Sequence, residues 1–366
     1  MKKILSLAAI FLVSASCNVF GGPGVLGVLK TLDAGGNWQA ADSIENSKNN
    51  ISGFSIAEMG FDPQNRQTLF LAAAEQGLWT STNSAASWHQ ILGNITAIDF
   101  YVDPASSQNI LVSGIFNNHG RIVKTSDGGK TWDELYQEAS VNNAVNSITA
   151  NPNNSKELYA GLNSGVLIKS VDGGVNWFVV FDFSDSKNAP QQNLPTFSAQ
   201  QITKVRFNPL NKALYVLTRA NGLAESTDGG VHFTYLTAAL TNQNFSDLIS
   251  LNPRRVDSFL KLALDDTNPG IIYLTTSNGL YKTSDDGKNW VFLNVPVQSA
   301  SQLPRAIAST RGGMVAYTSI GSTIFKTLDG GQSWQTEGLP TNNIVNKLLI
   351  DPQLSQIVYA GLIPPQ

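Results

Sequence analysis

The octapeptide Ser170-Val-Asp172-Gly-Gly174-Val-Asn176-Trp177 decides the fold of this chain, because the same pattern occurs seven times. The pattern is Ser or Thr, one variable residue, Asp, one variable residue, Gly, two variable residues and Trp; Asn83 replaces the Asp once, Ala85 the Gly once and Phe233 the Trp once. The acidic or amide position of each copy is Asp33, Asn83, Asp127, Asp172, Asp228, Asp285 and Asp329. The closing aromatic residues are Trp38, Trp88, Trp132, Trp177, Phe233, Trp290 and Trp334. Successive aromatics are 50, 44, 45, 56, 57 and 44 residues apart, which indicates a repeat protein.

The residue types of this octapeptide, which we call the box, are those of a rigid hairpin turn. The Asp carboxylate accepts hydrogen bonds from backbone N–H groups of a turn, and Gly supplies the positive φ that such turns require. The aromatic residue opens the next strand and is expected to fold back under the turn. Turn geometry therefore accounts for the box Asp residues, and we expect them to be structural rather than catalytic or metal-binding.

A second turn signal lies between the boxes. Asn or Asp followed by Pro separates two short apolar runs at residues 62–63, 103–104, 151–152, 208–209 and 351–352. The flanking runs, such as 95–102 with 109–113 and 145–150 with 157–160, are rich in residues that favour strands. Each repeat therefore reads as strand A, Pro turn, strand B, loop, strand C, box, strand D. Four antiparallel strands of this kind make one propeller blade.

The two ends of the chain carry complementary halves of a blade. The first box is preceded only by a C strand at residues 27–30, and the chain ends with an A and B pair at 346–350 and 357–361. Joining them removes the open strand edges that invite aggregation. The sequence thus predicts an all-β fold, a seven-bladed β-propeller over residues 25–366 whose last blade is closed by the N- and C-terminal segments.

Residues 1–16 have the features of a secretory signal peptide, followed by a short tether at 17–24. Lys2 and Lys3 precede a mostly apolar stretch at 4–13, and small residues lead to Cys17, the single cysteine. The segment resembles a bacterial lipoprotein signal, in which that cysteine is lipidated, and ordinary cleavage nearby is the alternative. We expect an exported protein of the bacterial cell envelope, at the periplasmic or outer surface, whose contact with a membrane is through the lipid anchor.

Composition narrows the classes of partner. The chain of 366 residues has 24 Lys and Arg against 27 Asp and Glu, which gives a net charge of −3. A net negative charge disfavours nucleic acid as a binding partner. One cysteine allows neither an intrachain disulfide nor a cysteine-based zinc site. Neither a catalytic motif nor a phosphate-binding loop appears. We expect a monomer without metal or cofactor.

Candidate binding residues follow from strand topology. The regular turns lie on one face of a propeller, and the B–C and D–A loops lie on the other. Long loops at 39–53, 182–201, 237–258 and 294–304 are polar, with Phe197, Phe245 and Leu248 as possible anchors, and binding residues concentrate on such loops. The alternative is that these loops are solvated connections. The donors expected on this face are His119, Arg121, Arg219, Arg254 and Arg255.

The octapeptide and its spacing resemble the Asp-box, or BNR-type, repeat family. The full repeat at 151–177 is similar to two seven-bladed groups, the photosystem II assembly and stability factors, which are not enzymes, and the xyloglucan-cleaving endoglucanases. Sortilin-type receptors and sialidases share the box on propellers of other blade number. The resemblance to xyloglucanases implies a glycan cleft between two propellers with a catalytic Asp on each, whereas this chain has length for one. Sialidases carry an Arg-Ile-Pro signature, which this sequence lacks.

These features favour a non-catalytic scaffold that binds a protein, peptide or glycan partner in the cell envelope. No residue is nominated as catalytic, because the boxes are explained by turn chemistry. A carbohydrate-active glycoside hydrolase, xyloglucanase-like or sialidase-like, is the alternative function. Such an enzyme needs two opposed carboxylates, and the sequence singles out no pair.

Overall fold

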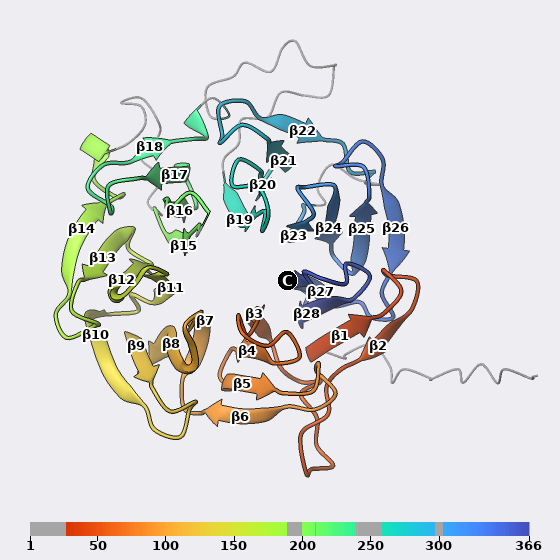
Figure 1. Ribbon diagram of the computed structural model, residues 1–366, viewed down its shortest axis with the longest axis horizontal. Coiled ribbons are helices and arrows are strands. Elements are labelled where there is room, and N and C mark those ends of the chain that lie inside the picture. The colour runs from red at the N-terminus through yellow and green to blue at the C-terminus, as the bar shows by residue number, and fades with distance from the viewer. Residues whose placement is uncertain are drawn as a thin grey trace, which may run out of the picture.

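The computed structural model describes residues 27–188, 200–208, 210–238, 240, 258–296 and 303–365. Within these residues, 28 strands form seven antiparallel four-stranded sheets. Figure 1 shows the sheets arranged as blades around a central axis, with one strand of each blade innermost. Neighbouring innermost strands contact each other around the ring, from β3 through β7, β11, β15, β19, β23 and β27 back to β3. The predicted seven-bladed propeller is confirmed.

The blades are numbered here in chain order, each from its innermost strand outward. Blade 1 comprises β3 (Ile56–Phe61), β4 (Leu69–Ala73), β5 (Gly77–Ser81) and β6 (His89–Leu92). Blade 2 comprises β7 (Thr96–Asp103), β8 (Ser106–Phe116), β9 (His119–Thr125) and β10 (Asp133–Val141). Blade 3 comprises β11 (Val145–Asn151), β12 (Asn154–Leu162), β13 (Val166–Ser170) and β14 (Phe178–Asp182). Blade 4 comprises β15 (Ile202–Phe207), β16 (Leu214–Thr218), β17 (Gly222–Ser226) and β18 (Thr234–Tyr235). Blade 5 comprises β19 (Phe259–Leu264), β20 (Ile272–Thr276), β21 (Gly279–Thr283) and β22 (Val291–Leu293). Blade 6 comprises β23 (Ala306–Thr310), β24 (Val315–Ile320), β25 (Thr323–Thr327) and β26 (Gln335–Gly338). A 3-10 turn (Ser186–Asn188) follows blade 3, and among the described residues no helix is long and apolar enough to cross a bilayer.

Blade 7 is assembled from both ends of the chain. Its strand order is β27 (Ile344–Ile350), β28 (Val358–Ile363), β1 (Gly27–Thr31) and β2 (Trp38–Ala40). The join between β1 and β28 is antiparallel and runs from Gly27 opposite Leu362 to Thr31 opposite Val358. The predicted closure is therefore confirmed, and Figure 1 shows the N-terminal strands beside the C-terminal ones.

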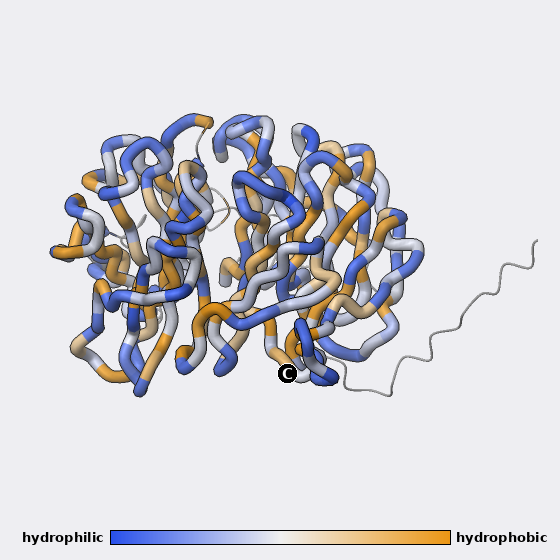
Figure 2. The backbone as a smooth tube through the Cα atoms, turned by 60° about the horizontal axis from the view of Figure 1, so that its bottom comes forward, coloured by the Kyte–Doolittle hydropathy of each residue, from blue (hydrophilic) through white to orange (hydrophobic). Residues whose placement is uncertain are grey.

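The core lies between blades rather than inside one layer. Within the described residues the buried hydrophobic side chains form seven clusters, and each cluster draws on two adjacent blades. Leu69 of blade 1 and Tyr359 of blade 7, for example, belong to one cluster. Figure 2 shows polar residues concentrated in the loops at the rims and hydrophobic residues along the strands. Every blade therefore depends on both neighbours, which couples the ring into one unit.

The boxes form hydrogen-bonded turns at the C–D hairpins. In the fourth copy, Ser170 Oγ donates to Asp172 Oδ1 at 2.8 Å and accepts from Gly174 N–H at 2.9 Å. The Asn176 N–H donates to Asp172 Oδ1 at 3.0 Å. Hydrogen bonds from the backbone and side chain of Asn176 and from Ser170 lower the pKa of Asp172 to about 2. Gly174 has φ of 101°, a value at which an L side chain is strained.

The box tryptophans reach further than their own turns. The Nε1–H of Trp132 donates to Ile91 O at 2.8 Å, and that of Trp290 donates to Leu236 O at 2.8 Å, each in the preceding blade. Trp177 donates both to Gly174 O in its own turn and to Leu135 O in the preceding blade. In these three copies the indole therefore ties adjacent blades together, whereas the Nε1–H groups of Trp38 and Trp334 have no hydrogen-bond partner among the described residues.

A Tyr–Lys pair makes a second tie between blades. Tyr273 Oη donates to Gly313 O at 2.7 Å, and Lys282 Nζ donates to the same oxygen at 3.1 Å. The Lys282 ammonium also lies 5.3 Å from the centroid of the Tyr273 ring. Tyr159 and Lys169 repeat the arrangement on Gly229 O. These pairs bond backbone oxygens of the following blade and stabilise the ring at its turn face.

Candidate functional site

Three of the five predicted binding residues lie in the described part of the chain. Arg219 lies in the loop between β16 and β17 and is exposed; its carbonyl oxygen accepts the N–H of Phe259 at 2.8 Å, at the start of β19. His119 is half-buried, with Nδ1 2.8 Å from Glu138 O. Arg254 and Arg255 lie outside the described residues, as do Phe197, Phe245, Leu248 and Cys17.

The placement of Arg121 in a loop was wrong. Asn117 and Asn118 have φ of 48° and 62°, so they form a two-residue hairpin turn with positive φ at both positions. Strand β9 therefore begins at His119, and Arg121 lies within it opposite Gly114. Its side chain forms an ion pair with Glu134 and lies over the Phe116 ring, 5.4 Å from its centroid. Arg121 thus braces the outer strands of blade 2.

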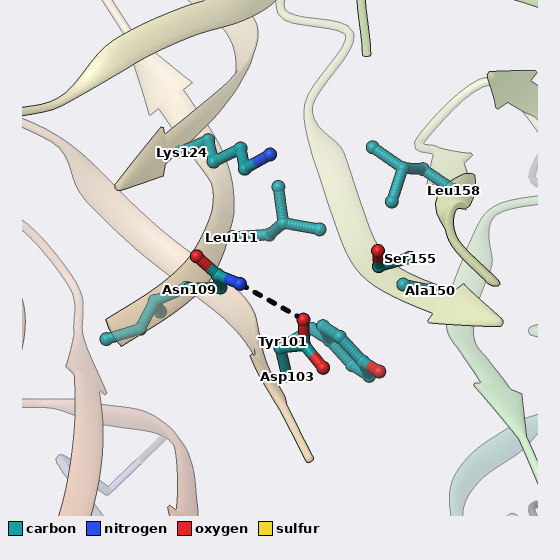
Figure 3. Close-up of a pocket in the computed structure, with 9 residues that line it drawn as sticks. Tyr101, Asp103, Asn109, Leu111, Lys124, Ala150, Ser155 and Leu158 are labelled. Atoms are coloured by element: carbon teal, nitrogen blue, oxygen red, sulfur yellow. Dashed lines mark hydrogen bonds between the residues drawn. The ribbon is translucent and has the colours of Figure 1, made fainter. Parts of the chain in front are cut away.

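A small cleft lies between blades 2 and 3 near the turn face (Figure 3). Tyr101, Asp103, Lys124 and Leu158 are among its lining residues, and Asn109 Nδ2 donates to Asp103 Oδ2 at 3.2 Å. Its volume of about 40 Å³ is room for roughly three water molecules, whereas ligand pockets span hundreds of Å³. This cleft is therefore too small for a sugar or a peptide side chain of ordinary size.

A group of polar and charged side chains lies around the propeller axis. Six innermost strands carry a β-bulge near their first residues, and the residue after the bulge is polar in each. A bulge re-aims the side chain that follows it. These six ring positions, in blade order and skipping blade 6, are Glu58, Asp99, Ser147, Lys204, Lys261 and Lys347. We call these residues together with Arg206, two residues beyond Lys204, the axial cluster.

Ion pairs join the axial cluster across the ring. Lys204 on blade 4 contacts Glu58 on blade 1, and its Nζ is 3.1 Å from Asp99 Oδ1 on blade 2. Blades 1 and 4 are three apart in a ring of seven, so this bridge crosses the axis. Lys347 on blade 7 contacts the other oxygen of Glu58. Lys204 and Glu58 thereby connect four blades at the centre, blades 1, 2, 4 and 7.

Asp99 is the most enclosed charged member of the axial cluster, with 1% of its side chain exposed. Arg206 donates to it in a bidentate manner, Nη1 to Oδ2 at 3.0 Å and Nη2 to Oδ1 at 2.9 Å. Ser147 Oγ donates to the same Oδ2 and accepts from Val205 N–H at 3.0 Å. Such paired, charge-assisted bonds are the strong ones in proteins. Every lone pair of this carboxylate therefore has a donor nearby.

Both axial carboxylates are held in their ionised form. Burial alone would raise the pKa of Glu58, but attraction to Lys204, Lys347 and Arg206 outweighs it and holds that pKa well below 4.5. For Asp99, burial is likewise outweighed by Arg206 and Lys204, so its pKa lies below 3.8. A general acid for glycoside hydrolysis needs a raised pKa. Neither residue has that property.

Positive charge is in excess in the axial cluster. Lys204, Arg206, Lys261 and Lys347 face two carboxylates, so the count is 4 − 2 = +2 in a chain whose net charge is −3. Lys261 is the cation without a partner: within the described part of the chain its ammonium makes neither an ion pair nor a hydrogen bond. Burial is the main cause that lowers the pKa of Lys261 to about 8. Across the described ranges, no group of three or more His, Cys, Asp or Glu is arranged to hold a metal ion.

Comparison with known proteins supports the fold. No family model matches the chain. A curated xyloglucanase from Paenibacillus sp. is 23% identical over an alignment of 276 positions that covers 72% of this chain and 23% of the xyloglucanase. The chain thus spans about a quarter of the length of that relative.

The solved structures that are similar in shape include a xyloglucanase and YCF48. The xyloglucanase of Xanthomonas campestris, of family GH74, has a TM-score of 0.65 and 16% identity over 84% of this chain and 51% of the enzyme. YCF48 bound to a D1 peptide has a TM-score of 0.59 and 13% identity over 85% of this chain and 94% of YCF48. The resemblance to xyloglucanases and photosystem II assembly factors expected from the boxes is therefore confirmed, and at these identities it establishes a shared seven-bladed propeller fold.

Proposed function

We propose that this chain is a non-catalytic propeller that binds a protein or peptide partner on its loop face. The observation that carries the proposal is the axial cluster. Its two carboxylates are engaged by Lys204, Arg206 and Lys347 and are held ionised, so they are suited to stabilising the ring and not to proton transfer. The cations left over give this face a charge that attracts acidic groups.

Two further observations support a binding role. Arg219 is exposed on the loop face, and its backbone is hydrogen-bonded to the start of β19, the strand that carries Lys261. YCF48, which is matched along nearly its whole length, has been solved with a bound peptide. A single propeller of this size thus supplies a rigid surface on which loops present donors to a partner.

A xyloglucan hydrolase is the second candidate function, and the sequence match to the Paenibacillus xyloglucanase favours it. A retaining or inverting glycosidase needs two carboxyl groups on opposite sides of the scissile bond, one with a raised pKa. Among the described residues, burial raises the pKa of Asp42, Glu225 and Asp266. Asp266 lies beside β19 at its turn-face end, 3.2 Å from Thr310 Oγ1, and is the acid to test first.

The two functions are separated by one pair of assays on the purified chain. Envelope extracts are passed over the wild type, an Arg219→Glu variant and a Lys130→Glu control, whose lysine is exposed in a box turn. We expect a partner that the wild type and the control retain and that the Arg219 variant loses. The Arg254→Glu/Arg255→Glu double variant is tested in parallel.

The same preparations are incubated with xyloglucan, other β-glucans and sialosides. We expect no turnover. Release of sugar by the wild type, lost in an Asp266→Asn or Glu225→Gln variant that remains folded, would replace the scaffold with a hydrolase.

We further propose that the propeller is exported and tethered through a lipid on Cys17. The support is the sequence of residues 1–17, which has a basic start, an apolar stretch and small residues before the cysteine. A Cys17→Ser variant is expected to leave the membrane fraction and to partition out of detergent. Normal processing with retained membrane binding would show that the anchor is elsewhere.

A further inference from the structure

We propose that the axial cluster contains a binding site for an anionic oxygen group, a carboxylate or an inorganic oxyanion, held between the ammonium groups of Lys261 and Lys347. This proposal rests on the binding function above and names the chemistry that the loop face recognises.

The two lysines occupy equivalent places on strands that flank blade 6. Lys261 on β19 lies opposite Thr275, and Lys347 on β27 lies opposite Gly361. In each pairing the partner is two residues beyond the buried tyrosine of the second strand, Tyr273 or Tyr359. At the equivalent position of blade 6, strand β23 carries Ala306, which lies opposite Ser319, two residues after Tyr317. On the strand between those of the two lysines, the equivalent ring position therefore carries only a methyl side chain.

The existing carboxylates do not neutralise both lysines. Glu58 contacts Lys204 and Lys347, and Asp99 contacts Lys204 and Arg206. Lys261 feels attraction from Glu58 and Asp99 and repulsion from Lys204 and Lys347. An enclosed charge without a partner is costly, and an added anion removes that cost. Of the four cations in the axial cluster, Lys261 is therefore the one that no carboxylate contacts.

Access is from the loop face. Lys261 is the third residue of β19, and the strand begins where the Phe259 N–H meets the carbonyl of exposed Arg219. A peptide that crosses the loop face near Arg219 would therefore bring an acidic side chain or its terminal carboxylate toward Lys261. A free phosphate or sulfate has the same oxygen chemistry, and the test below separates these sources.

The test reads Lys261 directly. Purified protein is acylated with an amine-reactive reagent at pH 8, and the modification of each lysine is followed by mass spectrometry. At pH 8 about half of Lys261 is neutral and reactive, and a bound anion that raises its pKa by about one unit lowers the reactive fraction about fivefold. Exposed Lys130 is the internal control and should not change.

Four probes are compared at constant ionic strength: inorganic phosphate, a tripeptide with a free C-terminal carboxylate, its C-terminal amide, and an amidated peptide containing one Asp. If the tripeptide with a free C-terminal carboxylate protects Lys261 from acylation and its amide does not, the site binds the terminal carboxylate of a peptide. Protection by the Asp peptide identifies an acidic side chain, and protection by phosphate alone identifies a small-anion site. Absence of protection by all four would overturn the proposal.

Variants link the site to binding strength. In calorimetry, Lys261→Met should weaken the effective probe about ten- to a hundredfold, as expected for loss of a hydrogen bond from a charged donor, and Lys261→Arg should restore most of the affinity. Lys130→Met should leave it unchanged. Equal probe affinity in Lys261→Met and the wild type would also overturn the proposal.

The outcome is independent of partner capture. If Lys261→Met still retains the captured partner while losing the probe, the anion site stands and the partner binds elsewhere. If the wild type captures a partner but binds none of the probes, the anion site fails and the binding function stands.

Discussion

Lys204 and Glu58 form a salt bridge through the middle of the propeller, between innermost strands that lie three blades apart. The axis of this propeller is thus crossed by charge rather than filled by apolar side chains. Glu58 is 10% exposed and shares its carboxylate with Lys347, so each of these groups depends on the others for neutralisation. Removal of one member of an enclosed ion pair leaves the other charge uncompensated.

The first prediction concerns this bridge. Glu58→Gln should lower the free energy of unfolding by about 2–4 kcal/mol, somewhat less than for a fully buried pair because Lys347 is partly exposed. Urea titration followed by tryptophan fluorescence measures the change. Glu75→Gln is the matched control: Glu75 is exposed in a hairpin, and we expect a change within about 0.5 kcal/mol. Equal effects of the two variants would show that the axial bridge contributes nothing.

The second prediction isolates the tie between blades 5 and 6. Tyr273→Phe removes the hydrogen bond from Oη to Gly313 O and should cost about 1–2 kcal/mol, because both groups are buried. Tyr281→Phe is the control, since Tyr281 is also buried but its hydroxyl makes no hydrogen bond among the described residues. The difference between the two variants in thermal unfolding gives the contribution of the tie. If Tyr281→Phe loses as much stability as Tyr273→Phe, the loss comes from altering a buried tyrosine and not from the hydrogen bond to Gly313.

The fold could be predicted from the sequence because its signals are local. A box such as Ser170 to Trp177 needs particular residue types at fixed spacing, and each requirement is met within eight residues. Closure was equally visible, since the missing strands of the last repeat lie at the opposite end of the chain. Strand lengths were underestimated at β8 and β12, because Asp103 pairs directly with Ser106 and Asn151 with Asn154 across very tight turns.

The axial cluster could not be predicted in the same way. Lys204-Val205-Arg206 alternates like a strand with one solvated face, and the sequence does not distinguish solvent from the axis of a ring. The partners Glu58 and Asp99 lie 146 and 105 residues away. The bulges that aim these side chains also leave no residue-type signature, since the bulged positions include Ala57, Ile98 and Thr203. Only the register of each strand pair reveals the ring.

The third prediction tests closure. Deleting residues 27–40 removes β1 and β2 and leaves β28 paired on one edge only, with β27. Because each blade packs on both neighbours, we expect loss of cooperative unfolding and association through the exposed edge. Circular dichroism melts and size-exclusion chromatography report both effects. Trimming residues 364–366, which follow β28, should change neither. A deletion variant that melts like the full chain would show that six blades are sufficient.

The last prediction follows from the cost of holding Lys261 charged at the axis. Its pKa is lowered to about 8 in the folded protein from 10.5 in an unfolded chain. Between these values the unfolded state binds more protons than the folded state, so stability contributed by this group rises with pH from about 8 and is lowest below it. Lys261→Met removes the cost. The variant should therefore be more stable than the wild type at pH 7, and the difference should shrink as the pH is raised from 8 to about 9.5.

The comparison is made below pH 10 because the buried tyrosines, such as Tyr273, have raised pKa values and destabilise the fold once they ionise in the unfolded chain. Paired urea titrations of the wild type and Lys261→Met at pH 6, 7, 8, 9 and 9.5 measure the difference, and Lys130→Met gives the baseline for loss of an exposed lysine. Greater stability of Lys261→Met together with weaker anion binding would mark Lys261 as a residue kept for its ligand at the expense of the fold. A constant stability difference across this range would mean that Lys261 titrates like an ordinary surface lysine and that the axis is open to solvent beside it.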